Sequence, residues 1–260
     1  MKNLRKYGKA PFNVAVIHGG PGAPGEMAPV ARELSALCGI LEPLQTANTI
    51  DGQIRELKDI ATKRGNPPLT LIGWSWGAWL SYLFAAQNPA LVKKLILIAS
   101  GPLEEKDAQN IMKTRLNRLS EEERAEAFLL INTLENPDKV NKDGAFMKLG
   151  KLISKADSYD PIPHKSFLLG CQYDIFEGVW KQAAELRRNG KLLEYGAKIH
   201  CPVVAIHGDY DPHPAEGVRR PLDRILTDFR FILLEKCGHT AWIERMAKDI
   251  FYETLMRELL

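Results

Sequence analysis

Long apolar runs are missing from this 260-residue sequence. Its apolar stretches, such as residues 95–99, have the length of a strand and fall far short of the ~20 residues that cross a bilayer as a helix. The basic residues near the start are not followed by the apolar segment of a secretion signal. We therefore expect a cytoplasmic protein that does not enter a membrane.

A charge imbalance is missing too, because 35 Lys and Arg residues stand against 32 Asp and Glu residues, for a formal net charge of +3. Basic residues gather only in short clusters such as Arg187-Arg188, which are typical of a solvated face rather than a phosphate-binding stripe. Nucleic acid is therefore not an expected partner. The sequence does not indicate the oligomeric state.

Cysteine is scarce, with four residues, at positions 38, 171, 201 and 237. None of them forms the CxxC spacing of a zinc site, and disulfides are rare in the cytosol. We therefore expect no metal site and no disulfide. The hydrophobic core must stabilise the fold, and 260 residues are enough for one such core.

Strand and helix patterns alternate at both ends of the chain. Short apolar, β-branched runs predict strands at residues 12–17, 40–44, 69–72, 94–99, 202–207 and 231–234. Apolar positions spaced as on one helix face predict helices at residues 27–37, 50–63, 78–87 and 241–260. This alternation predicts an α/β fold with a mostly parallel sheet of about six strands, covered by helices on both faces.

The pattern changes between residues 102 and 197, where no strand is predicted. Ser120 and Glu123 have the spacing of a capping box at the start of one helix. Further helical segments are predicted at residues 146–153 and 179–193. We interpret residues 102–197 as a helical lid inserted into an α/β core that comprises residues 1–101 and 198–260.

Ser75 lies in the sequence Gly73-Trp74-Ser75-Trp76-Gly77, which fits the pattern G-x-S-x-G. The pattern alone is weak, but a predicted strand precedes it and a predicted helix follows it, as a nucleophile elbow requires. The glycines leave room for a tight turn that exposes the serine hydroxyl above the sheet. We predict that Ser75 is a nucleophile; the alternative is a turn serine without chemistry.

The first clear strand ends in His18-Gly19-Gly20-Pro21-Gly22. Main chain rich in glycine can approach a reacting carbonyl there and donate an N–H to its oxygen. We predict that the amides of Gly20 and Trp76 form an oxyanion hole, and that His18 and Gly19 contribute to substrate binding. The alternatives are a turn without chemistry and a phosphate-binding loop, which the missing Lys-Ser/Thr pair disfavours.

A serine hydroxyl needs a base, and the base needs an acid that fixes its tautomer. Asp211 follows one late predicted strand and His239 follows the last. Both therefore lie at the carboxyl edge of the sheet, as does Ser75, and ligands bind at this edge in parallel sheets. We predict that His239 is the base and Asp211 the acid.

Two neighbouring residues offer alternatives to this assignment. Asp209 is the second candidate for the acid, although it lies closer to the strand end than Asp211 does. His213 could line a pocket, but we interpret it as a solvated loop histidine.

Four segments, residues 18–22, 73–77, 208–214 and 238–239, resemble in this order the corresponding segments of the α/β-hydrolases. The His-Gly-Gly-Pro-Gly and Ser-Trp-Gly sequences resemble the prolyl iminopeptidase-like branch. The resemblance implies a Ser-His-Asp triad that works through an acyl-enzyme without metal or cofactor. Two features depart from the branch. Residues 42–51 replace its usual Asp-x-Arg-Gly-x-Gly segment, and only about a dozen residues precede the first clear strand, too few for its usual hairpin.

Members of that branch hold the free amine of the substrate with lid carboxylates. Asp174 and Glu177 lie at about the corresponding place, although a solvated helix face is the simpler explanation for them. The resemblance thus predicts a serine hydrolase for a small ester or amide, short peptides included. We keep three alternatives: an aminopeptidase specific for proline, a carboxylesterase, and a non-catalytic binding protein of the same fold.

Overall fold

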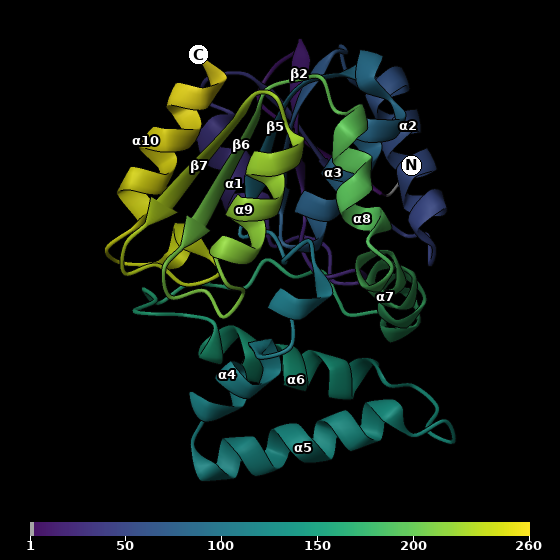
Figure 1. The fold of residues 1–260 in the computed structure, drawn as a ribbon, viewed down its shortest axis with the longest axis vertical. Coiled ribbons are helices and arrows are strands. Elements are labelled where there is room, and N and C mark those ends of the chain that lie inside the picture. The colour runs from purple at the N-terminus through teal and green to yellow at the C-terminus, as the bar shows by residue number, and fades with distance from the viewer. Residues whose placement is uncertain (1–2) are drawn as a thin grey trace.

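A seven-stranded sheet forms the centre of the computed structural model, which describes residues 3–260 (Figure 1). The strands are β1 (Leu4–Tyr7), β2 (Phe12–Ile17), β3 (Gly39–Pro43), β4 (Leu69–Trp74), β5 (Val92–Ile98), β6 (Val203–Gly208) and β7 (Phe229–Leu234). Their order across the sheet is β1-β3-β2-β4-β5-β6-β7. β1 is antiparallel to β3, and the other pairs are parallel. Residues 1 and 2, which belong to the predicted core, lie outside the described residues.

The sheet has one strand more than the six predicted. The additional strand is β1, which pairs with β3 from Leu4 opposite Pro43 to Tyr7 opposite Ile40. It lies in the short segment before the first predicted strand, which is too brief for the usual hairpin. With four residues, two of them basic, β1 gives no readable apolar alternation, and its pairing with β3 defines it as a strand.

Helices cover both faces of the sheet, as predicted. They are α1 (Ala28–Leu34), α2 (Ile50–Arg64), α3 (Trp76–Gln87), α4 (Ile111–Asn117), α5 (Glu121–Glu135), α6 (Asp143–Ala156), α7 (Tyr173–Arg188), α8 (Lys191–Glu194), α9 (Glu216–Ile225) and α10 (Lys248–Leu259). α1 and α10 pack on one face, and α2, α3 and α9 pack on the other. Successive residues of β2 serve the two faces in turn, since Val14 and Val16 join one cluster and Ala15 and Ile17 the other.

The chain between β5 and β6 divides into two parts. α4, α5 and α6 form a layer beyond the carboxyl ends of the strands (Figure 1), with a small apolar cluster that includes Leu119, Ala127 and Ala156. α7 and α8 instead join the main core through residues such as Val179 and Leu192. The assignment of residues 102–197 as one separate lid stays a prediction.

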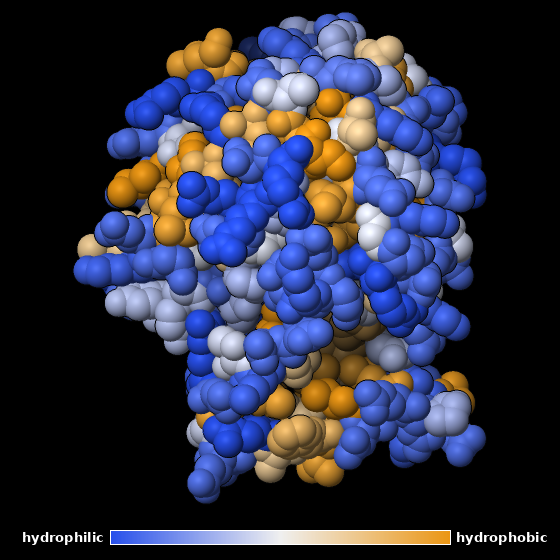
Figure 2. Space-filling model, in the orientation of Figure 1, coloured by the Kyte–Doolittle hydropathy of each residue, from blue (hydrophilic) through white to orange (hydrophobic). Residues whose placement is uncertain are grey.

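The outer layer carries apolar surface, which Figure 2 shows over the helices beyond the sheet. Phe128 and Leu129 of α5 are 50% and 68% exposed, and Met147 of α6 is also exposed. The capping box predicted for Ser120 and Glu123 is confirmed, because both of its reciprocal hydrogen bonds are present at the start of α5. No helix within residues 3–260 is both long enough and apolar enough to span a bilayer.

Candidate active site

Ser75 lies on a tight turn between β4 and α3. Its φ of 55° and ψ of −116° are unusual for a residue with a side chain. Its N–H donates to the carbonyl of Ile98 at 2.9 Å. A Cβ on Gly73 would collide with the carbonyl of Gly77, and one on Gly77 would collide with the carbonyl of Ile17. The predicted strand–turn–helix geometry is therefore present, and both glycines are required by close packing.

The turn places Ser75 at the surface of an otherwise buried region. Ser75 is partly exposed, whereas Gly73, Trp76 and Gly77 are buried. Trp76 is the first residue of α3, and the N–H groups of a helix's first turn have no partners within the helix. Negative charge is favoured at such an end because of these groups and the helix dipole.

The glycine-rich loop after β2 packs directly on this turn. A Cβ added to Gly19 would lie 3.1 Å from the Cβ of Ser75 and 2.7 Å from the ring of Trp74. Gly20, the next residue, has a φ of 43°, in the region that glycine favours. Main chain at this point can therefore come closer to Ser75 than any side chain would allow.

His18, a predicted substrate-binding residue, lies in the interior of the protein. Its imidazole is fully buried. Nδ1 lies 2.7 Å from the carbonyl oxygen of Gly19, and Nε2 accepts the N–H of Gln45 at 3.3 Å. Burial lowers the pKa of His18 to about 4, so the ring is neutral. With both nitrogens engaged by main chain, the ring fixes the loop.

Asp211 and His239 form a buried pair, although 28 residues separate them in the chain. Nδ1 of His239 lies 2.7 Å from Oδ2 of Asp211, whose side chain has no exposed surface. Asp209 points elsewhere, since its Oδ1 accepts the N–H of Cys237 at 3.1 Å. The loops after β6 and β7 thus bring Asp211, and not Asp209, to the imidazole.

Electrostatics make this pair an anion beside a base. Burial alone raises the pKa of the Asp211 carboxyl, but the imidazoles of His239, His213 and His207 outweigh it and hold that pKa well below its usual range. Burial alone lowers the pKa of His239, but the Asp211 carboxylate outweighs it and raises that pKa. The carboxylate therefore stabilises a proton on His239.

Trp74 connects this pair to the serine turn. Its indole N–H donates to the carbonyl of His239 at 2.9 Å, and the two rings lie 5.4 Å apart. His239 is therefore a direct neighbour of the residue that precedes Ser75. The hydrogen bonds of its ring do not include one to the Ser75 hydroxyl; bonds between nucleophile and base often shorten only in the substrate complex.

The interpretation of His213 as a solvated residue is wrong. It is only 9% exposed, and its Nδ1 lies 2.7 Å from Oδ1 of Asp211, the oxygen that His239 does not use. The main-chain N–H of His213 also donates to Oδ1, at 2.9 Å. The available signal in the sequence was its position two residues after a candidate acid, in the same tight loop.

Asp211, His213 and His239 also resemble a metal-binding set, because they offer ligand atoms that all lie within 4.8 Å of one another. However, each imidazole directs its Nδ1 at a carboxylate oxygen at 2.7 Å. That is the distance of an N–H donated to a carboxylate. A metal ion bound by both Nδ1 atoms and the carboxylate would have to displace both of these protons.

Comparison with known proteins identifies the family. A model of the alpha/beta hydrolase fold matches residues 32–245 of the sequence. The chain belongs to the α/β-hydrolase family. The fold class predicted from the sequence is thereby confirmed.

Solved structures resemble this α/β-hydrolase over nearly its full length. VinJ has a TM-score of 0.68 and 17% identity over 98% of this chain and 93% of its own. The meta-cleavage product hydrolase CumD from Pseudomonas fluorescens IP01 has a TM-score of 0.66 and 16% identity over 99% and 93%. The thioesterase domain from the curacin biosynthetic pathway has a TM-score of 0.61 and 17% identity over 98% and 94%. No curated protein matches the sequence. At these identities the likeness shows the fold alone.

The two carboxylates predicted to bind an amine are on α7 of this α/β-hydrolase. Asp174 and Glu177 are both exposed in its first two turns. The start of α7 adjoins the glycine-rich loop, since the N–H of Gln172 donates to the carbonyl of Gly22 at 2.8 Å. The carboxylates are therefore carried by an element that touches the loop.

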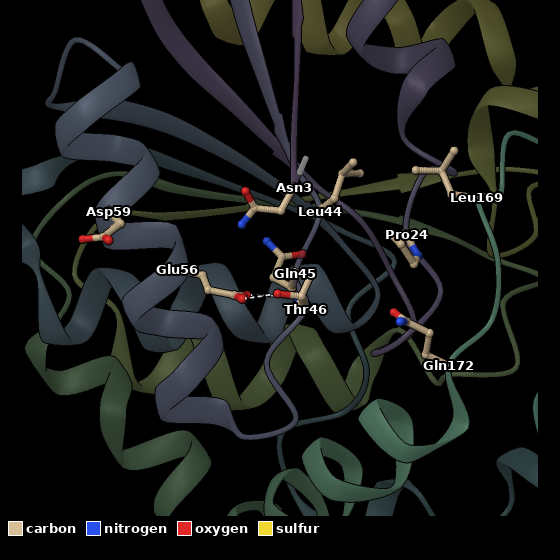
Figure 3. Close-up of a pocket in the computed structure, with 9 residues that line it drawn as sticks. All are labelled: Asn3, Pro24, Leu44, Gln45, Thr46, Glu56, Asp59, Leu169 and Gln172. Carbon is tan, nitrogen blue, oxygen red and sulfur yellow. Dashed lines mark hydrogen bonds between the residues drawn. The ribbon is translucent and has the colours of Figure 1, made fainter. Parts of the chain in front are cut away.

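A cleft of about 480 Å³ is lined by Pro24, which follows the same loop, and by Gln172, which precedes α7 (Figure 3). Figure 3 shows Glu56 and Asp59 of α2 on one side, Pro24 and Leu169 on the other, and Gln45 between them. Neither Ser75 nor the Asp211–His239 pair lines it. The volume of this cleft is therefore not part of the candidate active site.

Gly77→Ala should destabilise the protein by about 1–3 kcal/mol, the usual cost of forcing an extra carbon into a packed core, because its Cβ would collide with β2. Gly150→Ala is the matched control. That glycine lies within α6 with open space around it, so the control should gain ~0.5–1 kcal/mol. Urea unfolding measures both. Equal stabilities of the two variants would contradict the packing of the turn.

His18 should make the protein lose stability in mild acid. The unfolded chain takes up this proton below pH ~6.5, but the folded protein resists it until about pH 4. Stability is therefore complete above pH ~6.5 and falls as the pH drops towards 4, by about 3 kcal/mol for a shift of this size. His18→Asn should flatten this part of the curve in urea unfolding from pH 4 to 7.5, whereas the exposed His164→Asn should not. Parallel curves for wild type and His18→Asn would refute a buried neutral ring.

Proposed function

We propose that this α/β-hydrolase is a serine hydrolase that cleaves a small ester or amide through an acyl-enzyme. The observation that carries the proposal is the buried Asp211–His239 pair, which packs on Trp74 directly beside the strained Ser75. Strained backbone at a partly exposed serine and an imidazole with a raised pKa are features of nucleophilic catalysis.

In the proposed reaction, His239 takes the proton of Ser75 while the serine oxygen attacks the substrate carbonyl. The ionised Asp211 holds Nδ1 of His239 and stabilises the imidazolium. His239 then gives the proton to the leaving alcohol or amine as the acyl–oxygen or acyl–nitrogen bond breaks. Water, deprotonated by His239, then attacks the acyl-enzyme. His239 returns this proton to the Ser75 oxygen as the acyl–oxygen bond breaks, which releases the acid and regenerates the serine. The cycle needs neither metal nor organic cofactor.

The oxyanion hole is assigned to the main-chain amides of Gly20 and Trp76. The close packing of Gly19 on Ser75 and the position of Trp76 at the start of α3 support this assignment. Each such donor contributes about 10²–10³ to the rate. His18 supports it indirectly, because its ring fixes the carbonyl of Gly19.

Residues 102–197 are assigned as the lid. The layer of α4 to α6 beyond the strand ends supports this role (Figure 1). A small molecule or short peptide is the proposed substrate, and a prolyl iminopeptidase-like aminopeptidase is the specific form suggested by the His-Gly-Gly-Pro-Gly and Ser-Trp-Gly sequences. A carboxylesterase with the same machinery is the alternative.

Ser75→Ala should lower kcat by about 10³–10⁶, as loss of a catalytic nucleophile does, and should abolish labelling by a fluorophosphonate. His239→Gln should have a comparable effect on kcat. Ser154→Ala, at an exposed serine of α6, is the matched control and should react as wild type does. Hydrolysis of short p-nitrophenyl esters and of proline arylamide provides the assay. An unlabelled, inactive wild type would instead favour a non-catalytic binding protein.

Asp174→Asn and Glu177→Gln separate the two substrate classes. If these carboxylates bind a free amine, each change should raise KM for proline arylamide about 10-fold or more, the cost of a lost charged hydrogen bond. Neither change should affect a p-nitrophenyl ester without an amine. If both variants hydrolyse both substrates with wild-type kinetics, the aminopeptidase form is excluded and the esterase form is left intact.

A further inference from the structure

The Asp211 carboxylate binds two imidazoles. Oδ2 faces Nδ1 of His239 and Oδ1 faces Nδ1 of His213, each at 2.7 Å. The two rings are 4.7 Å apart. Two buried bases thus share one negative charge, but the proposed reaction uses only one of them.

Arg115 of α4 reaches this pair from the outer helical layer. Its Nη2 lies 3.5 Å from Nε2 of His213. Since Nδ1 of His213 donates to Asp211, Nε2 carries the lone pair and faces the guanidinium. The fixed positive charge therefore opposes a second proton on His213.

Asp157, the C-cap of α6, completes the network. Its carboxylate accepts three hydrogen bonds from Arg115: Nε donates to Oδ1 at 2.8 Å and to Oδ2 at 3.2 Å, and Nη2 donates to Oδ2 at 2.6 Å. Its own carbonyl accepts the N–H of His239 at 2.9 Å. The contacts form a closed ring through His239, Asp211, His213, Arg115 and Asp157.

The charges in this ring separate the two imidazoles. Burial, Arg115 and His239 lower the pKa of His213 to about 4 against the pull of Asp211. The pKa of His239 is raised instead, because Asp211 and Asp157 stabilise its protonated form more than burial and Arg115 destabilise it. His207 also faces the carboxylate, with Nε2 3.7 Å from Oδ2, and it lies 2.8 Å from the carbonyl of His213.

We propose that His213, Arg115 and Asp157 are positioning residues. They keep the Asp211 carboxylate available to stabilise a proton on His239 rather than on His213. His213 holds the second oxygen of the carboxylate. Arg115 adds its positive charge to the burial that keeps His213 neutral, and Asp157 orients Arg115 and the His239 main chain. Because Arg115 and Asp157 belong to α4 and α6, the charge state of the base depends on the docking of these helices. The inference rests on the proposed function for its kinetic part only.

Arg115→Met tests the inference, with kcat measured against pH on an ester that the wild type hydrolyses. Wild-type log kcat should fall in acid with a slope of 1, for one proton on His239. In Arg115→Met the slope should rise above 1, because His213 then takes up its proton at a higher pH than in the wild type, and kcat should fall about 10-fold or more with KM nearly unchanged. Arg115→Lys keeps the charge and should keep the slope of 1.

The double variant Arg115→Met/His213→Asn should return the slope to 1, because no second imidazole remains and the Asn amide can still donate to Oδ1. Arg118→Met is the matched control for helix docking. Arg118 donates to the carbonyl of Ala156 at 3.1 Å and stacks on Tyr210 without touching His213. Arg118→Met should leave the slope of log kcat against pH at 1. A slope of 1 in Arg115→Met with unchanged kcat, or a steep slope that persists in the double variant, would overturn the inference.

Histidine NMR titration gives a readout that does not depend on activity. His213 should stay neutral down to about pH 4 in the wild type and should titrate at a higher pH in Arg115→Met. An inactive protein with this NMR behaviour would contradict the proposed function but not the network. An active protein whose His213 titrates identically in both forms would contradict the network alone.

Discussion

The active-site region depends on one buried negative charge. The side chain of Asp211 has no exposed surface, and an isolated carboxylate in such a place would take up a proton rather than stay ionised. It stays ionised because two imidazoles donate to its two oxygens and the N–H of His213 adds a third bond. Loops from two strands meet at this carboxylate, and the helical layer reaches it through His213, so its charge organises side chains from distant parts of the chain.

The sheet determines where this charge can meet a serine. In parallel strands all carboxyl ends share one edge, and β2, β4, β6 and β7 run in that sense next to one another or to β5. The glycine-rich loop, the serine turn, Asp211 and His239 follow those four strands in turn. Each strand therefore contributes one part of the candidate site, and the register between strands aligns the parts.

Much of the fold was predictable because its signals are local. Apolar runs gave six of the seven strands, and the capping box gave the start of α5. β1 was missed since four residues contain no periodic pattern, and its partner β3 lies more than thirty positions away. The start of α7 was also missed: the helical pattern suggested residue 179, whereas the helix begins at Tyr173, where aromatic residues pack against α6.

The sequence by itself determined the order of strands and helices, the tight turn at Ser75 and the glycine loop, because sterics and apolar spacing act between close neighbours. Only the tertiary structure decided which aspartate meets His239, why the His18 ring is buried, and why His213 is a buried partner of Asp211. These outcomes depend on contacts between residues that are far apart in the chain, such as Arg115 and His213, 98 positions from each other. A sequence pattern shows which groups are present, but burial and distance decide which side chains bind the same carboxylate.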